Sequence, residues 1–342
     1  MNKYVVLSLV FLVLGSLLMA QSASITYQLS YTDNAFNLSD EDLDKFENKQ
    51  GFTYIDTSDD LIQTINMRVS HSYRNKNYRI SPSISLTQNS YINNSDKSGF
   101  NVLTGFNSRI YKAFVDIRYG WYPNNYLRKY KDTDGTQKDE NFEYGKNLYK
   151  MTVKYPVAKR LDAELYGKSE DYYHNKYFTE YDGNALTTGI GLYSKYQPGI
   201  LSLYYYFRQF DNKSDNQQMQ TVIDTQKDCS YDSDCFEIKY QFPKFYAKSN
   251  FVDYSPYFSY RFENVKYTSK HSVSLDPIHA TRKDTKIKVN IGTTLYAFKN
   301  IDFKLDAIKE FRRVSSEYEK LKYSKNYDKF QINASVSYML DF

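Results

Sequence analysis

The sequence predicts an all-β chain that closes into an antiparallel transmembrane β-barrel of about fourteen strands, with roughly twelve to sixteen compatible with the pattern. Three observations predict it: apolar residues recur at every second position, short and long connections alternate, and the composition leaves no room for membrane-spanning helices. The mean hydropathy is −0.68, and 25% of the 342 residues are charged. After Ala20 no apolar run is long enough to span a bilayer as a helix, so any insertion must use strands. The 37 Tyr residues suit the aromatic girdles of such a barrel.

Residues 328–342 at the end of the chain carry the organising pattern. Every second residue in this segment is apolar or aromatic, and most of the residues between them are polar. The apolar or aromatic positions are Phe330, Ile332, Ala334, Val336, Tyr338, Leu340 and Phe342. Period two predicts a strand with one apolar and one polar face. At ~3.3 Å per residue this strand is roughly 45 Å long, more than a tilted strand needs to cross a bilayer. An amphipathic last strand of a soluble β protein is the alternative.

This ending resembles that of bacterial outer-membrane β-barrel proteins, whose last strand typically closes on an aromatic residue after alternating apolar positions. The resemblance rests on Tyr338, Leu340 and Phe342 and covers the rest of the chain only by pattern. It implies an outer-membrane location and recognition of the last strand by the barrel-assembly machinery.

The beginning of the chain has the pattern of a secretory signal. Lys3 precedes the nearly uniformly apolar stretch 4–20, and the small residues Ala20 and Ala23 follow. We therefore expect residues 1–20 to be a signal peptide and residues 24–342 to form a single barrel domain. An uncleaved anchor helix is the alternative.

Fourteen segments of the mature chain have strand periodicity. The clearest internal example sets Ile287, Val289 and Ile291 against Lys286 and Lys288. Pro82 cannot donate to a strand ladder, so a bulge is expected there. The expected strands are 24–31, 61–73, 78–88, 100–110, 113–122, 147–155, 161–168, 185–196, 200–207, 235–242, 254–267, 285–298, 301–312 and 328–342.

The connections between these strands alternate between short and long. Short turns include 111–112, 197–199 and 299–300, whereas 32–60, 123–146 and 268–284 are long and polar. The pair 235–242 and 254–267 is the exception, because a longer aromatic segment joins them. In an antiparallel barrel this alternation places all long loops at one end and both termini at the other, periplasmic end.

Several loops contain residues that could carry more specific chemistry. In the first loop, Ser39 is expected to cap a short helix over 40–47, in preference to a cation site formed by the acidic residues of this segment. Asp132 and Asp134 form a second weak cation candidate. Cys229 and Cys235 are expected to form a disulfide, because they are the only two cysteines of an exported chain.

No catalytic motif and no cofactor are expected. The sequence has no G-x-S-x-G, H-E-x-x-H or phosphate-binding glycine loop. The alternative is a hydrolase at the barrel rim that uses His174, His271 or His279, which lie in or near predicted loops.

Function is expected in the lumen, whose predicted wall is strongly charged. So many charges require water or counter-ions, because a dry charge costs several kcal/mol. The predicted lumen-facing cations are Arg68, Arg79, Arg118, Lys150, Lys154, Arg208, Lys239, Arg261, Lys286, Lys288 and Lys304. The predicted lumen-facing anions are Asp116, Asp162, Glu164, Glu237, Glu263, Asp302 and Asp306.

These features predict a water-filled pore for small polar solutes or ions, with a mild preference for anions. In one alternative the charges brace a closed barrel, with the first loop or the loop 123–146 folded inside as a plug. In another the barrel only anchors loops that bind a surface partner. Expected partners are outer-membrane lipid, the assembly machinery and the solute, without nucleic acid, and the oligomeric state is left open.

Overall fold

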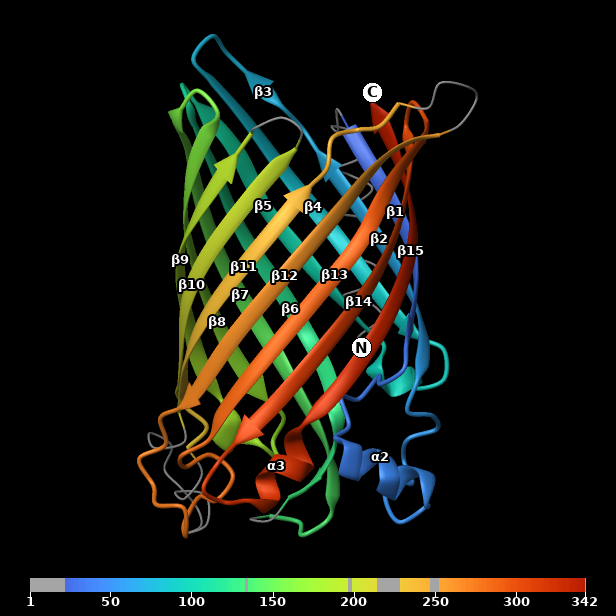
Figure 1. Ribbon diagram of the computed structural model, residues 1–342, viewed down its shortest axis with the longest axis vertical. Coiled ribbons are helices and arrows are strands. Elements are labelled where there is room, and N and C mark those ends of the chain that lie inside the picture. Colours follow the sequence, from blue (N-terminus) through green and yellow to red (C-terminus); the bar gives the residue numbers. More distant parts are fainter. Residues whose placement is uncertain (1–21, 133–134, 196–198, 214–227, 247–251, 342) are drawn as a thin grey trace.

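The computed structural model describes residues 22–132, 135–195, 199–213, 228–246 and 252–341, and within them the chain forms one closed antiparallel barrel (Figure 1). The predicted signal peptide 1–20, Asp134 and Phe342 lie outside these residues. The strands are β1 (Ser22–Thr32), β2 (Asp60–Ser70), β3 (Tyr73–Arg74), β4 (Tyr78–Tyr91), β5 (Gly99–Ile110), β6 (Ala113–Lys131), β7 (Asp139–Ala158), β8 (Leu161–His174), β9 (Gly183–Ser194), β10 (Ile200–Asn212), β11 (Tyr231–Gln241), β12 (Asp253–Tyr267), β13 (Lys283–Phe298), β14 (Ile301–Ser315) and β15 (Tyr327–Asp341). The helices are α2 (Asp40–Glu47), η1 (Ser95–Lys97), η2 (Thr179–Tyr181) and α3 (Lys320–Lys325).

Each strand pairs with its neighbours in the sequence, and β1 closes the ring by pairing with both β2 and β15. Fourteen long strands form the wall, while the two-residue β3 only extends the β2 edge of β4. Closure leaves no free edge, which is the condition for strands to cross a bilayer. The predicted fold class and strand number are confirmed in the described residues.

The first and last described residues, Ser22 and Asp341, lie at the end of the barrel that carries the short turns. Ser22 pairs with Asp341 there, next to the turns that join β5 to β6 and β13 to β14. The helices α2 and α3 lie at the opposite end with the long connections (Figure 1). We call these the turn end and the loop end. The predicted asymmetry of the connections is confirmed outside the exceptional pair β11 and β12, whose connection is longer than the other turns. These two strands are nevertheless neighbours, with Tyr231 opposite Tyr267.

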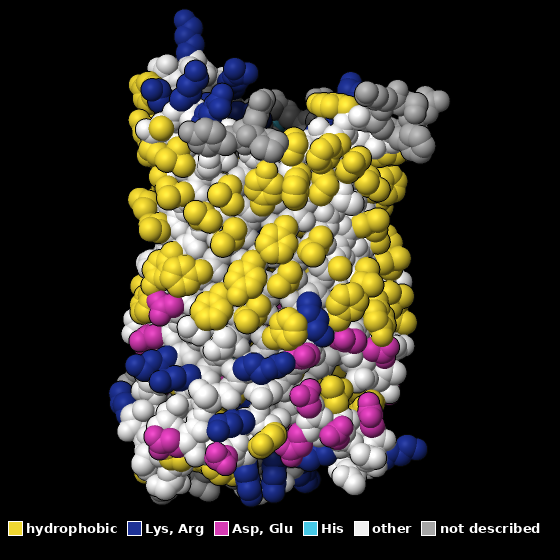
Figure 2. Space-filling model, viewed as in Figure 1, with side chains coloured by type: hydrophobic (Ala, Val, Ile, Leu, Met, Phe, Trp, Pro, Cys, Tyr) yellow, Lys and Arg dark blue, Asp and Glu magenta, His cyan; other side chains and the backbone are white. Residues whose placement is uncertain are grey.

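The outer surface carries a broad apolar belt that begins near the turn end (Figure 2). On the last strand Ile332 is 48% exposed and Tyr338 43% exposed, whereas the alternate residue Asn333 is buried. The part of the wall nearest the loop end bears Lys, Arg, Asp and Glu instead (Figure 2). The belt is the surface that a bilayer would cover, and the strands continue beyond it into a polar rim. No helix in the described residues is both long and apolar enough to cross a membrane.

The strands β6 and β7 are much longer than the sequence predicts. The segment 123–146, expected to be a loop and a possible plug, is mostly strand: β6 continues to Lys131 and β7 starts at Asp139. Between the apolar belt and the loop end the outer face is exposed to water, so apolar residues need not alternate there. The hydrophobic pattern therefore does not reveal these parts of the strands. Bulges next to Tyr122 and Tyr126 shift the register further.

The first long loop, 33–59, is folded rather than extended. Ser39 caps α2 by accepting a hydrogen bond from the Asp42 N–H at 3.1 Å, as predicted. A small apolar core of Ala35, Phe36, Leu38 and Ile55 packs against Tyr126 of β6. The loop is therefore docked on the rim at the loop end and does not fill the barrel as a plug.

The bulge predicted at Pro82 does not form. At Pro82 the β4–β5 register is continuous, with Pro82 opposite Phe106. The strand pairing is interrupted instead on the opposite edge of β4. There the partner strand breaks between β2 and β3, because Pro82 has no N–H to donate to it.

The predicted disulfide is also wrong, because Cys229 and Cys235 are both free thiols. Cys235 lies inside β11 and Cys229 just before it. An extended segment at ~3.3 Å per residue separates the two by roughly 20 Å, far beyond the ~7 Å limit between bridged Cα atoms.

Candidate functional site: the lumen and its mouth

Three cavities follow the inner wall between the turn end and the loop end. The first, about 350 Å³, lies at the turn end and is lined by Arg68 and Arg79. Beside it Arg118 contacts Asp116 at 2.7 Å, Asn107 at 2.9 Å and Ser83 at 2.7 Å. The guanidinium groups here are hydrogen-bonded mostly to serine and asparagine side chains. Because these partners carry no charge and are short, the wall is net basic and faces an open cavity.

The second cavity, about 480 Å³, lies between β7 and β13 and holds several of the predicted lumen charges. Lys150, Arg208, Arg261, Glu263 and Lys286 all line it. The free thiol of Cys235 lies in the same wall. A third cavity of about 290 Å³ shares Arg261, Glu263 and Lys286 with it and adds Lys288, Glu310 and Arg312. Because they share lining residues, the two cavities adjoin along the inner wall.

The other predicted lumen residues form small groups on the same inner face. Lys154 contacts Asp162 at 3.7 Å and lies over the ring of Tyr193, whose hydroxyl donates to Glu164. On β11, Lys239 contacts Glu237 at 3.1 Å.

On β14, Lys304 contacts Asp306 at 3.8 Å. Asp302 lies two residues earlier, opposite Ser337 of β15. Most predicted lumen charges are thus paired along or between neighbouring strands, as an ion-pair lattice on a wide wall would be.

A crowded ion cluster that the sequence pattern does not predict is centred on Glu170. Its carboxylate contacts Arg208 at 2.6 Å, Lys168 at 2.8 Å and Lys146 at 3.0 Å. The Glu170 side chain is only 3% exposed. The apolar pattern predicts a strand only as far as residue 168, whereas β8 continues past Glu170 to His174. The charged pattern Lys168, Glu170 at alternate positions is the signal that could have extended the strand.

At the loop end a fourth cavity of about 550 Å³, which we call the mouth pocket, is bounded by residues from several loops. Its wall consists of Phe36, Asn37, Leu127, Arg128, Tyr130, Lys131, Phe142, Phe178, Tyr181, Ile278, His279, Arg282, Arg312, Ser324 and Lys325. Arg128 on β6 and Arg312 on β14 come from nearly opposite sides of the ring. The mouth pocket is therefore bounded by residues from both sides of the ring, and it adjoins the third cavity, which Arg312 also lines.

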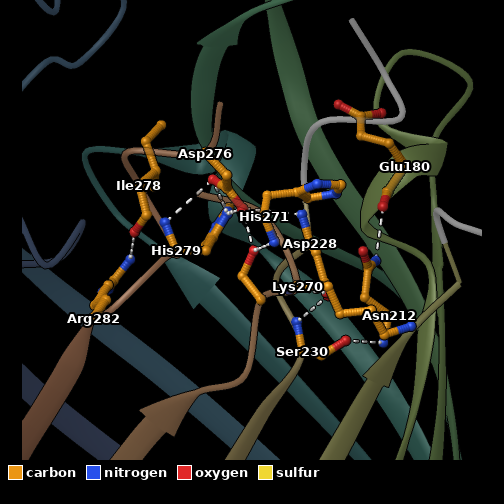
Figure 3. Close-up of polar contacts among 11 residues, drawn as sticks. Glu180, Asn212, Asp228, Ser230, Lys270, His271, Asp276, Ile278, His279 and Arg282 are labelled. Carbon is orange, nitrogen blue, oxygen red and sulfur yellow. Dashed lines mark hydrogen bonds and ion pairs between the residues drawn. The ribbon is translucent and has the colours of Figure 1, made fainter. Parts of the chain in front are cut away.

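A network of buried carboxylates holds the loops around this pocket (Figure 3). Asp276 accepts hydrogen bonds from the Asp228 N–H at 3.1 Å and from Ser269 at 3.0 Å, and it contacts the His279 ring at 3.0 Å. Asp228 in turn accepts from the backbone N–H groups of Ser230 and Lys270. Burial alone would raise the pKa of Asp276, but these hydrogen bonds and His279 outweigh it and hold the pKa below its ordinary range.

The histidines singled out as catalytic alternatives have structural surroundings. His279 contacts Asp276 as described, and His174 contacts Asp182 at 3.1 Å and packs against Phe142 and Tyr144. His271 lies in the same loop as Asp276, and its backbone N–H donates to Ser269. The structure does not bring a serine or cysteine nucleophile into a described hydrogen bond with any of these rings.

Comparison with solved structures finds bacterial outer-membrane proteins at low sequence identity. A bacterial polysaccharide outer membrane secretin superimposes with a TM-score of 0.47 at 9% identity, covering 94% of this chain and 99% of that one. An anion-selective porin from Comamonas acidovorans gives 0.46 at 7% identity, over 93% and 98% of the two chains. OprD of Pseudomonas aeruginosa gives 0.41 at 9% identity, over 93% and 94%. No protein-family model and no curated protein sequence matches the chain.

The closed ring of strands, the apolar belt and the charged inner wall are properties of this chain's own structure. They agree with the resemblance to porin-like outer-membrane β-barrels that the sequence predicts.

Proposed function

We propose that the chain is an outer-membrane pore that lets small polar solutes or ions pass by diffusion. The observation that carries the proposal is a row of adjoining cavities along a charged inner wall. The mouth pocket and the third cavity share Arg312, and the third and second cavities share Arg261, Glu263 and Lys286. Charges that line a dry interior would cost several kcal/mol each, so this wall is expected to be hydrated.

The proposed location is the outer membrane, with the turn end in the periplasm and the loop end outside the cell. The apolar belt supplies the lipid-facing surface, and the outward positions of Tyr338 and Leu340 on β15 suit recognition by the assembly machinery. Export would require the signal peptide predicted over 1–20.

A liposome-swelling assay tests passage without relying on charge. Refolded protein in vesicles should admit arabinose faster than a trisaccharide such as raffinose, because the cavities limit solute size. Vesicles that swell no faster than protein-free vesicles would contradict the pore. A shift in gel mobility on heating should first show that the barrel has folded.

A second candidate is a barrel that presents its loops to a surface partner. Exposed apolar side chains at the loop end favour it: Leu275, Ile278, Tyr318 and Tyr323 are between 38% and 71% exposed. Deletion of 270–278 that abolishes cell-surface binding but leaves vesicle swelling intact would assign binding to the loops and passage to the barrel. If the deletion changed neither surface binding nor vesicle swelling, this second candidate would be contradicted.

A further inference from the structure

The mouth pocket differs from the second and third cavities in that its lining contains cations but no carboxylate. Its fifteen lining residues, all in described parts of the chain, include five cations and no Asp or Glu. The cations are Arg128, Lys131, Arg282, Arg312 and Lys325. The second and third cavities, in contrast, contain Glu237, Glu263 or Glu310 beside their cations. The first cavity, at the turn end, lacks Asp and Glu as the mouth pocket does.

Carboxylates just outside the pocket neutralise only part of this charge. Asp42 contacts Arg128 at 2.9 Å. Asp284, which is 1% exposed, contacts both Arg282 at 2.8 Å and Arg312 at 2.5 Å. Three guanidinium groups therefore share two carboxylates, and Lys325 forms no ion pair within the described part of the chain.

Among the cations of the mouth pocket, Lys325 is the partly buried one without a carboxylate partner in the described residues. It lies on α3, outside the membrane-spanning strands, and burial lowers its pKa to about 8. Repulsion from Arg128, Arg282 and Arg312 adds to this lowering, and Asp42 opposes it only weakly. A bound anion would offset both the burial and the repulsion.

The opposite wall of the pocket is aromatic and rigid. The Phe142 ring lies 4.9 Å from Phe178, 5.2 Å from Tyr181 and 5.2 Å from Tyr130. Phe178 is 3% exposed, so the cluster is fixed by its own packing. Such a surface accepts the face or edge of a planar ring. At about 550 Å³ the pocket has the size of a site for one small organic molecule.

We propose that the mouth pocket binds a small organic anion that carries a planar apolar ring, with the anionic group at Lys325 and the ring against the Phe142 cluster. The proposal deepens the pore proposal, because the same solute would then enter the lumen past Arg312. The cations of the third cavity, Lys286 and Lys288, would receive the anion next.

Calorimetry on the detergent-folded barrel tests the site without requiring a current. The probes are benzoate, acetate as its ring-free match and benzylammonium as its cationic match. Wild-type protein should bind benzoate and neither of the other two. Lys325→Met should weaken benzoate binding roughly 10- to 100-fold, as expected for one charge-assisted contact, and Lys325→Arg should restore most of it.

Lys320→Met on the exposed side of the same helix is the matched control and should bind benzoate like the wild type. Equal binding of acetate and benzoate, or equal benzoate binding by Lys325→Met and the wild type, would overturn the proposal. The heat-dependent gel shift verifies folding of each variant. Since benzoate binding needs no conductance, a folded barrel that binds benzoate but passes no solute would overturn only the pore.

Discussion

Arg128 of β6 donates through Nη1 to Asp42 Oδ2 of α2 at 2.9 Å, and this ion pair joins the first loop to the rim of the barrel across 86 residues of sequence. Both side chains are nearly buried, at 11% and 13% exposure. The pair both docks the first loop and neutralises one guanidinium of the mouth pocket.

Asp42→Asn should therefore loosen the first loop and make the mouth more basic. We expect hydrogen exchange over 33–59 to become faster, because Arg128 loses the charged partner of a buried ion pair. The free energy of local opening should fall by about 1–3 kcal/mol. The reversal potential in a KCl gradient should shift toward anion preference. Asp44→Asn, on the exposed face of α2, is the control. Unchanged exchange in Asp42→Asn would show that Phe36 and Leu38 alone dock the loop.

Glu170→Gln should destabilise the barrel and raise its preference for anions. The substitution leaves Arg208, Lys168 and Lys146 facing one another without their shared carboxylate. We expect a loss of about 1–3 kcal/mol in the free energy of unfolding, less than for a dry pair because lumen water screens the cations. Urea unfolding followed by gel mobility measures it. A wild-type midpoint would mean that the cluster contributes nothing to stability.

Acid should release the loops that Asp276 holds. Its folded-state pKa lies below the ordinary value of 3.8, so the ionised carboxylate stabilises the loops above that pH. The stabilisation is lost as the pH falls through the folded pKa. Hydrogen exchange over 268–282, corrected for intrinsic rates, should accelerate in the wild type between pH 5 and about pH 3. Asp276→Asn should already exchange fast at pH 5, and wild-type protection in this variant would contradict the network.

The preference for anions should weaken as the pH rises through about 8, where Lys325 loses its proton. Arg128, Arg282 and Arg312 face the same space and stay charged. Lys131, His279, Tyr130 and Tyr181 complete the titratable lining, and Asp42 is the acid that acts on Lys325. Reversal potentials measured from pH 6.5 to 9.5 should therefore change in the wild type. They should change much less in Lys325→Met. An equal change in both proteins would assign the titration to another group.

Both thiols should react as free cysteines. Iodoacetamide applied to unreduced, denatured protein should add two carbamidomethyl groups, one each at Cys229 and Cys235. Mass spectrometry of the intact chain counts them. A chain that takes up the label only after reduction would restore the predicted disulfide and would require β11 to begin later than Tyr231.

The sequence predicted the wall of this barrel better than its mouth. Wherever lipid would cover the outer face, apolar residues must alternate, and strands such as β13 and β15 are readable from that pattern alone. Beyond the belt both faces are wet, so the extension of β6 to Lys131 and of β8 to His174 left no apolar signal.

The mouth pocket could not be found by spacing, because Arg128, Phe178, Arg282 and Lys325 come from four separate connections or strand ends. Only the closure of the ring brings them together. One local clue exists: Arg282 and Asp284 are two residues apart and therefore share a strand face, which indicates a paired arginine at the end of β13.

Single-channel recording in a planar bilayer tests the central claim most directly. Refolded protein should produce stepwise, ohmic increases in current in KCl, with a reversal potential that indicates anion preference at pH 7. A barrel whose folding is verified by its heat-dependent gel shift, but which inserts without any current above that of the bare bilayer, would contradict a water-filled lumen.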